Sequence, residues 1–153
     1  MAVHPSHRIE FAAAMLIAGR RQQHPFADAA TTIPQQWAAF KSEDIKVYQQ
    51  PVTYGVVCGV SDSAMDYLCG VAVSSFEEAP NNAGRVIIPA QKYAVFVHHG
   101  PIAQIGESWQ TIYHQLMPQR GLEDAHTPCF ERYDERYDAP RGDGIVEIWC
   151  PVK

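Results

Sequence analysis

The chain has 153 residues, which is enough for one domain and leaves little room for a second. Its 12 lysines and arginines against 17 aspartates and glutamates give a formal net charge of −5, which argues against nucleic-acid binding, since that needs clustered positive charge. Hydrophobic residues make up 46% and charged residues 19%, as in a globular protein, and the apolar run at 12–18 is far too short to span a bilayer.

The first half of the chain predicts a strand, a helix and two further strands. Strands are expected at 7–22, 47–60 and 66–75. Between the first two, Thr31-Thr-Ile-Pro34 is typical of a helix start, with a threonine cap and a proline in the first turn. Ile33, Trp37 and Phe40 then recur at i, i+4 and i+7, which predicts one apolar helical face.

The second half repeats that order of elements. Strands are expected at 85–89, 92–98, 129–138 and 145–152. Residues 102–116 predict a helix, because Ile105, Trp109 and Ile112 fall on one face, and Met117-Pro118 is expected to end it.

The two predicted helices share a short pattern. Ile33-Pro-Gln-Gln-Trp37 aligns with Ile105-Gly-Glu-Ser-Trp109. With the matching element order, this predicts a single domain at 1–153 that contains an internal duplication, with halves of about 7–78 and 85–153. We expect an α+β fold of two β-α-β-β units related by a pseudo-twofold. Its antiparallel sheet would carry two packed helices and a ligand groove between the halves.

Cysteine and histidine spacing indicates no metal site. The cysteines at 58, 69, 129 and 150 form no CxxC pair, which favours buried free thiols in a reducing compartment. The seven histidines show no ligand spacing and are expected to be structural or solvated. The N-terminal MAVHPSHRIEF lacks a basic patch followed by an apolar core, so we expect no signal peptide and a cytoplasmic protein without metal or cofactor.

Glu147 is an acidic residue inside the apolar run Val146-Glu-Ile-Trp-Cys-Pro-Val152. On a strand it shares a face with Trp149, while Ile148 and Cys150 take the other face, which we expect to meet the helices. A buried carboxylate without a partner costs several kcal/mol, so Glu147 requires one.

The nature of that partner separates two interpretations. An internal pair with Arg85, Arg132 or Arg136, or exposure at a sheet edge, gives a structural role. A ligand cation gives a functional one: at about 4 Å it contributes roughly 4 kcal/mol at an effective dielectric constant of about 20. Aromatic faces add about 0.5–2 kcal/mol per contact, and the chain has 3 Trp, 7 Tyr and 6 Phe. Core packing is the alternative role for Trp37 and Trp109.

Residues 85–153 resemble the GyrI-like, or AraC-type effector-binding, domains. Four segments carry the resemblance in order: Gln91-Lys-Tyr-Ala-Val-Phe-Val-His-His-Gly-Pro101, Trp109, Pro128-Cys-Phe-Glu-Arg-Tyr133 and Val146-Glu-Ile-Trp-Cys-Pro-Val152. The first half matches by element order. The resemblance implies a duplicated β-α-β-β fold and, in multidrug-sensing members, a glutamate on the last strand that binds lipophilic cations in an aromatic pocket.

The resemblance assigns that glutamate position to Glu147 and extends the expected ligand site to Trp37, Trp109 and Tyr133. Trp149, on the strand face of Glu147, completes it, and no catalytic residue is assigned. Many relatives carry a helix-turn-helix DNA-binding region, and none fits before His7. We therefore expect a free-standing module without direct nucleic-acid or membrane contact.

Three functions remain open. The first is a module that binds hydrophobic organic cations, linked to transcriptional regulation or drug resistance. The second is a hydrolase of cyclopropane-containing DNA alkylators, in which Glu147 activates water. The third is a gyrase-interacting protein whose acidic segment 131–138 faces a basic partner, although a solvated strand face also explains that segment. A separate regulatory protein and a homodimer stay open as partners.

Overall fold

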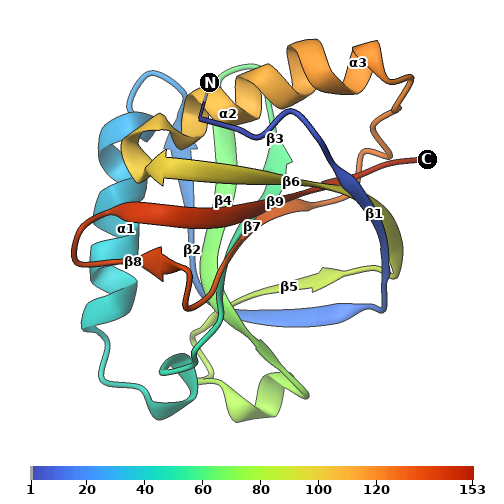
Figure 1. Ribbon diagram of the computed structural model, residues 1–153. Helices are drawn as coiled ribbons and strands as arrows, with labels where there is room; N and C mark the ends of the chain where they lie inside the picture. The colour runs from blue at the N-terminus through green and yellow to red at the C-terminus, as the bar shows by residue number, and fades with distance from the viewer. Residues whose placement is uncertain (1) are drawn as a thin grey trace.

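A single curled antiparallel sheet organises residues 2–153, the part of the chain that the computed structural model describes; Met1 of the expected domain lies outside it (Figure 1). Its nine strands are β1 (Arg8–Ala12), β2 (Met15–Pro25), β3 (Thr53–Val60), β4 (Ala64–Val73), β5 (Gly84–Ile88), β6 (Gln91–Pro101), β7 (Cys129–Tyr133), β8 (Tyr137–Asp138) and β9 (Asp143–Pro151). The longer helices are α1 (Ala29–Ser42) and a helical stretch that contains α2 (Ile105–Thr111) and α3 (Met117–Gln119). The α+β fold class is confirmed.

The strand order reads symmetrically from its two ends. The order is β1-β6-β9-β7-β3-β4-β2-β5, with β8 paired to β9. The series β1, β6, β9, β7 therefore mirrors β5, β2, β4, β3, as two pseudo-twofold-related units would produce. The short edge strands are exchanged, because β1 precedes β2 but pairs with β6, while β5 precedes β6 but pairs with β2. An origin by duplication stays a prediction.

Helix α1 begins earlier than the sequence indicates. The Asp28 carbonyl accepts hydrogen bonds from the backbone N–H groups of Thr31 and Thr32, both at 2.9 Å, so the first turn forms at Ala29. Asp28 is the N-cap residue, and Pro34 lies inside the helix instead of in its first turn. The expected apolar face is confirmed, since it packs on the cluster formed with β2 and β4.

The second helical stretch runs past its expected end. It passes from a 3-10 turn at Ile102–Gln104 through α2 to a π-helical turn at Ile112–Leu116, and then to α3. The π turn resets the hydrogen-bond register, so Pro118 falls in the first turn of α3, where its missing N–H costs little.

Three expected strands are shorter or divided. The strand expected at 7–22 is two strands, β1 and β2, at opposite ends of the sheet order. The strand expected at 47–60 begins only at Thr53, because a 3-10 turn at Lys46–Tyr48 and then Pro51 precede it. The strand expected at 129–138 is interrupted after Tyr133, where the Tyr137 N–H donates to the Asp134 carbonyl in a turn.

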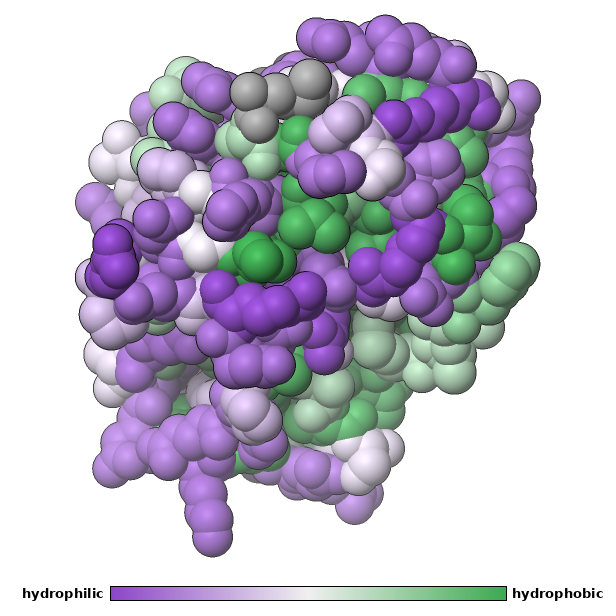
Figure 2. Space-filling view, viewed as in Figure 1, coloured by the Kyte–Doolittle hydropathy of each residue, from purple (hydrophilic) through white to green (hydrophobic). Residues whose placement is uncertain are grey.

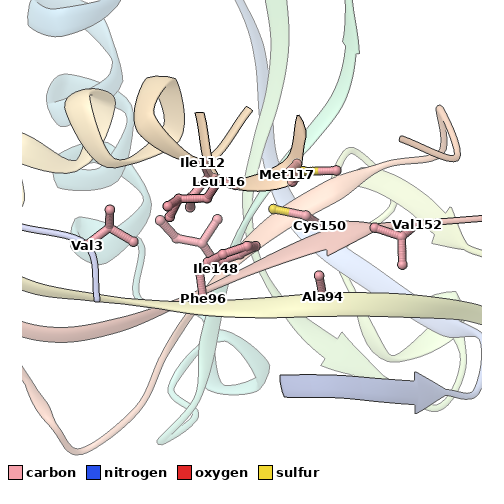
Figure 3. Close-up of a cluster of buried hydrophobic side chains, with 9 residues drawn as sticks. All are labelled: Val3, Ala94, Phe96, Ile112, Leu116, Met117, Ile148, Cys150 and Val152. Carbon is pink, nitrogen blue, oxygen red and sulfur yellow. The ribbon is translucent and has the colours of Figure 1, made fainter. Parts of the chain in front are cut away.

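Both faces of the sheet bury apolar side chains. Under the second helical stretch, Ile112, Leu116 and Met117 point down onto side chains of β6 and β9, and Val3 joins them from the N-terminal segment (Figure 3). The opposite face closes around a separate cluster that includes Ile17. Strand alternation alone therefore does not reveal which face carries the helices.

The surface combines charged and apolar areas. Figure 2 shows one face, where hydrophilic residues surround smaller apolar regions. The most exposed large apolar side chain within the described range is Phe11, at 79%, on the edge strand β1. The four cysteines are free thiols, and no helix in residues 2–153 is both long and apolar enough to cross a membrane.

Candidate functional site

A cavity of about 1630 Å³ lies on the helix-covered face of the sheet. Its walls come from α1 on one side, α2 and the π turn on the other, and the segment 124–129 that leads into β7. Strands β3, β4 and β7 supply further lining residues. The cavity is therefore built where the two halves of the strand order meet, between β3 and β7.

Glu131 is the buried acidic group of this cavity. Its side chain is on β7, and the residue is only 5% exposed. Tyr67 and Tyr133 each donate an O–H hydrogen bond to Oε1 at 2.7 Å, and Trp109 donates its Nε1–H to Oε2 at 2.8 Å. Because these donors come from β4, β7 and α2, the carboxylate ties three elements together.

No cation neutralises Glu131 within the described residues. No lysine, arginine or histidine nitrogen of residues 2–153 lies within 4.0 Å of its oxygens. Burial raises the pKa of Glu131, and the three hydrogen bonds oppose that rise only in part. Burial also holds the pKa values of Tyr67 and Tyr133 well above their ordinary 10, so both remain neutral donors.

Gly55 makes room for this arrangement. It lies opposite Glu131 in the β3–β7 register. A Cβ atom at this position would lie 1.9 Å from the Tyr67 hydroxyl and 2.7 Å from Glu131 Oε1. The tyrosine–carboxylate contact therefore occupies the space that any larger residue on β3 would fill.

Helix α1 places Trp37 against the same network. Its Nε1–H donates to the Tyr67 hydroxyl at 3.2 Å, and its ring lies 5.1 Å from the Tyr133 ring at 68°. The preceding residue, Gln36, is buried and bonds to His24 Nε2 at 2.5 Å. The indole N–H of Trp37 thus reaches Glu131 through one tyrosine.

Helix α2 provides the facing wall. Trp109 stacks on Tyr113, with ring centroids 5.9 Å apart and planes 19° apart. Its preceding residue, Ser108, is buried and shares a 2.7 Å hydrogen bond with His98 Nδ1. Each helix therefore presents one tryptophan to the cavity and anchors the residue before it on a buried histidine of the adjacent strand.

Charged groups also lie along the cavity wall. Lys41 is on α1, Glu107 on α2, and Asp124 and His126 on the segment that leads into β7. Lys41 Nζ lies 5.8 Å from the Trp37 ring. The two walls thus carry charges of opposite sign.

The structure brings together three of the five expected ligand-binding residues. Trp37, Trp109 and Tyr133 line the cavity. Glu147 and Trp149 do not, because they lie on the face of β9 opposite to the one that meets the helices.

Glu147, which was expected to pair with a ligand cation, is surrounded by three of the protein's own arginines. Arg8 and Arg136 bond to Oε2 at 3.0 and 3.1 Å, Arg132 lies 3.7 Å from Oε1, and Trp149 donates to Oε1 at 3.1 Å. The alternative of an internal pair with Arg132 or Arg136 is thus confirmed. The protein's own guanidinium groups already supply the charge that a ligand was expected to supply.

Sequence reasoning missed Glu131, Tyr67 and Tyr113 as cavity residues. It placed Glu131 in a solvated acidic strip, whereas this carboxylate is buried and Asp134 is held by Arg132 and Arg136, each at 2.7–2.8 Å. The available signal was alternation in Phe130-Glu-Arg-Tyr133, where Glu131 shares a strand face with Tyr133 and not with Phe130.

The described residues offer no metal cluster. No group of three or more His, Cys, Asp or Glu side chains in residues 2–153 is arranged to hold an ion. Two cavity cysteines are poor ligands as well, since burial raises the pKa of Cys58 to about 11 and that of Cys129 to about 12.

Comparison with known proteins identifies the family to which this chain is related. A family model described as the GyrI-like small molecule binding domain matches residues 5–153. The transcriptional regulator BrlR of Pseudomonas aeruginosa is 34% identical over 125 residues, which cover 79% of this chain and 46% of the regulator. The chain thus spans about half the length of that relative.

Two solved structures share the fold. The structure of SAV2435 bound to tetraphenylphosphonium has a TM-score of 0.77 at 20% identity, covering 97% of this chain and 94% of that chain. The EcmrR C-terminal domain has a TM-score of 0.66 at 17% identity, covering 100% and 99%.

Proposed function

Because the chain belongs to the family of GyrI-like small molecule binding domains, we propose that its cavity binds hydrophobic organic cations, with Glu131 as the counter-charge. One observation carries the proposal: a buried carboxylate in an aromatic cavity has three neutral donors and no basic group of residues 2–153 within 4.0 Å. A cation that enters the cavity supplies the opposite charge and so offsets the free-energy cost of burying the Glu131 carboxylate.

The hydrogen-bond donors around Glu131 favour cations that carry no N–H group. Three hydrogen bonds occupy most of the lone-pair positions of Glu131, so few remain for an N–H donor on the ligand. The indoles of Trp37 and Trp109 offer aromatic faces instead. Aryl-substituted phosphonium and delocalised dye cations fit this site, as the tetraphenylphosphonium complex of SAV2435 supports.

Tetraphenylphosphonium titration followed by tryptophan fluorescence tests the proposal. Glu131→Gln removes the charge and is expected to weaken cation binding about tenfold or more, equivalent to about 1.4 kcal/mol. Binding of neutral triphenylphosphine oxide should change much less. Glu135→Gln is the matched control, because Glu135 occupies the same place in the second Glu-Arg-Tyr triplet but is exposed. Equal losses for both probes in Glu131→Gln would exclude the counter-charge role.

A hydrolase is the second candidate function. The raised pKa of Glu131 is the property that a general base needs. The three donors oppose this role, because they stabilise the ionised form and leave little access for a water. Turnover of a cyclopropane-containing alkylator above the buffer rate, lost in Glu131→Gln, would establish it.

The relation to BrlR and to the EcmrR C-terminal domain further supports an effector-binding role in regulation. The gyrase-interacting alternative has less support, since Glu131 and Asp134 of the acidic segment are occupied within the protein. A supercoiling assay with added gyrase tests it.

A further inference from the structure

We propose that Lys41 makes the cavity selective for amphoteric ligands, with the cationic part near Glu131 and an anionic group at the α1 rim. This inference rests on the proposed function and defines its ligand class more narrowly. Its basis is that the two cavity walls differ in charge although the strand order around them is symmetric.

Lys41 is the sole lysine or arginine among the described residues that line the cavity. The other charged lining groups are the carboxylates of Glu107, Asp124 and Glu131, together with His126. The acidic groups lie on α2, on the following segment and on β7, whereas Lys41 lies on α1. A ligand that spans the cavity therefore meets a positive charge at one wall and negative charges elsewhere.

The Lys41 ammonium has no acidic partner in residues 2–153. No carboxylate oxygen there lies within 4.0 Å of Nζ. The ammonium instead lies 5.8 Å from the Trp37 ring and 6.0 Å from the Phe40 ring. The side chain is exposed at the rim, although partial desolvation lowers its pKa. Its charge is thus available to a ligand.

Aromatic rings separate the two opposite charges. Trp37 lies between Lys41 and Tyr133, with its ring 5.1 Å from the tyrosine ring, and the Tyr133 hydroxyl donates to Glu131. Lys41 and Glu131 therefore form no ion pair with each other. An aryl group that packs on Trp37 would carry a cation toward Glu131 and an anion toward Lys41.

A purely cationic ligand lacks this second attraction. It meets the like charge of Lys41 and competes with that ammonium for the Trp37 face. An anionic substituent reverses the sign of the interaction. Lys41 is therefore a specificity-determining residue, separate from the counter-charge itself.

Rhodamine B and its ethyl ester test this inference as a matched pair. They share the delocalised cation and differ in one carboxylate. Fluorescence polarisation at pH 7.5 and low salt gives the Kd of each dye for wild type and Lys41→Gln. We expect Lys41→Gln to weaken rhodamine B and to strengthen the ester, each by about threefold, as for a partly exposed charge pair. Lys46→Gln is the control, because Lys46 is exposed and does not line the cavity.

The outcomes separate this inference from the proposed function. If both dyes bind and Lys41→Gln leaves the ratio of their Kd values unchanged, the selectivity role is wrong while cation binding stands. If neither dye binds wild type, the proposed function fails and the selectivity role fails with it. A ratio that shifts in Lys41→Gln, is unchanged in Lys46→Gln and declines with added salt supports the inference.

Discussion

The Glu131 carboxylate combines a raised pKa with fixed neutral donors. Burial raises the pKa, while hydrogen bonds from Tyr67, Trp109 and Tyr133 act in the opposite direction. Protonation removes the charge that attracts a cation. We therefore expect cation affinity to fall as the pH decreases through this raised pKa, which is a measurable link between one side chain and the proposed function.

Tyr133→Phe tests that link at the level of one hydroxyl. The variant removes a 2.7 Å hydrogen bond to the ionised carboxylate, so the pKa of Glu131 should rise further. The pH midpoint of tetraphenylphosphonium binding should then rise by about one unit, because one pKa unit corresponds to about the free energy of one hydrogen bond to a charged group. Tyr137→Phe is the control, since Tyr137 also lines the cavity but makes no hydrogen bond to Glu131. Superimposable pH profiles for all three proteins would contradict the role.

Gly55→Ala tests the space behind the carboxylate. The added Cβ would lie 1.9 Å from the Tyr67 hydroxyl, so the tyrosine and Glu131 must shift. We expect a loss of about 1–3 kcal/mol in the free energy of unfolding, measured by urea denaturation, and weaker cation binding. Gly59→Ala, on the same strand, has no atom within 4 Å of its new Cβ and should behave like wild type. Equal behaviour of the two variants would contradict the proposed steric role.

The sequence predicted the aromatic residues that line the cavity better than it predicted the acidic residue there. Trp37 and Trp109 follow from helical spacing, because one face of each helix must meet the sheet. The choice between Glu131 and Glu147 does not follow, since both are glutamates within strands that alternate. Only the curl of the sheet, which buries a second cluster on the Glu147 side, decides which strand face lines the cavity.

At the scale of elements, each helix is held above the sheet by a polar anchor and an apolar cluster. The anchors are His24 with Gln36 and His98 with Ser108. The N-terminal segment adds a third support for α2. It runs along β6, with the His4 N–H bonded to the Val97 carbonyl at 2.8 Å, and it inserts Val3 into the core. Residues before β1 therefore help to position the wall that carries Trp109.

Val3→Ala tests this support. Val3 is 1% exposed beneath the second helical stretch, so its truncation leaves a cavity. We expect a loss of about 1–3 kcal/mol in urea denaturation. Val60→Ala is the control, because Val60 is 68% exposed, and it should change stability by less than about 0.5 kcal/mol. A wild-type stability for Val3→Ala would show that the segment is not part of the core.

Element boundaries were less predictable than element types. Periodicity predicted both helices but not their ends. The backbone carbonyl of Asp28 accepts the first hydrogen bonds of α1, so this helix begins earlier than predicted, and the π turn continues the second helical stretch past Pro118. The alanine-rich stretch at 12–14 gave no sign that 7–22 divides into two strands, because alanine signals neither a turn nor a strand. Local hydrogen bonds set the helix limits, whereas pairing with the distant strands β6 and β5 sets the division between β1 and β2.

At the scale of the whole molecule, ion pairs stabilise the sheet face opposite the helices. Arg8, Arg132 and Arg136 join β1, β7 and the β8 turn to the buried carboxylate of Glu147 and to Asp134. Burial acts to raise the pKa of Glu147, but bonds from Trp149, Arg136 and Arg8 lower it overall. The Arg136 hydrogen bond lowers the pKa of Asp134.

Glu147→Gln tests this network through pH. A lowered folded-state pKa contributes stability that is present above the unfolded pKa, near 4.5, and is lost as the pH falls through the folded value. Because Glu147→Gln weakens hydrogen bonds to a charged group, the variant should be about 2 kcal/mol less stable than wild type at pH 7. The difference should shrink below pH 4.5 in a urea denaturation series, since the pKa of Glu147 is lowered in the folded protein. Glu123→Gln, which removes an exposed carboxylate near Lys153, is the control. A difference that does not vary with pH would contradict the charged role of Glu147.

Because the two edge strands are exchanged, the order in which strands can pair during synthesis is fixed. β1 leaves the ribosome long before β6, its one sheet neighbour among residues 2–153, since Arg8 pairs with Val95 and Ala12 with Gln91. β2 can pair with β4 early, but it waits for β5 to cover its other edge. Each half therefore takes one edge strand from the other: the first half needs β5, and the second half needs β1. A nascent chain stopped after β4 would expose the edges of β2 and β3, which later pair with β5 and β7, and so we expect it to depend on chaperones until β7 emerges.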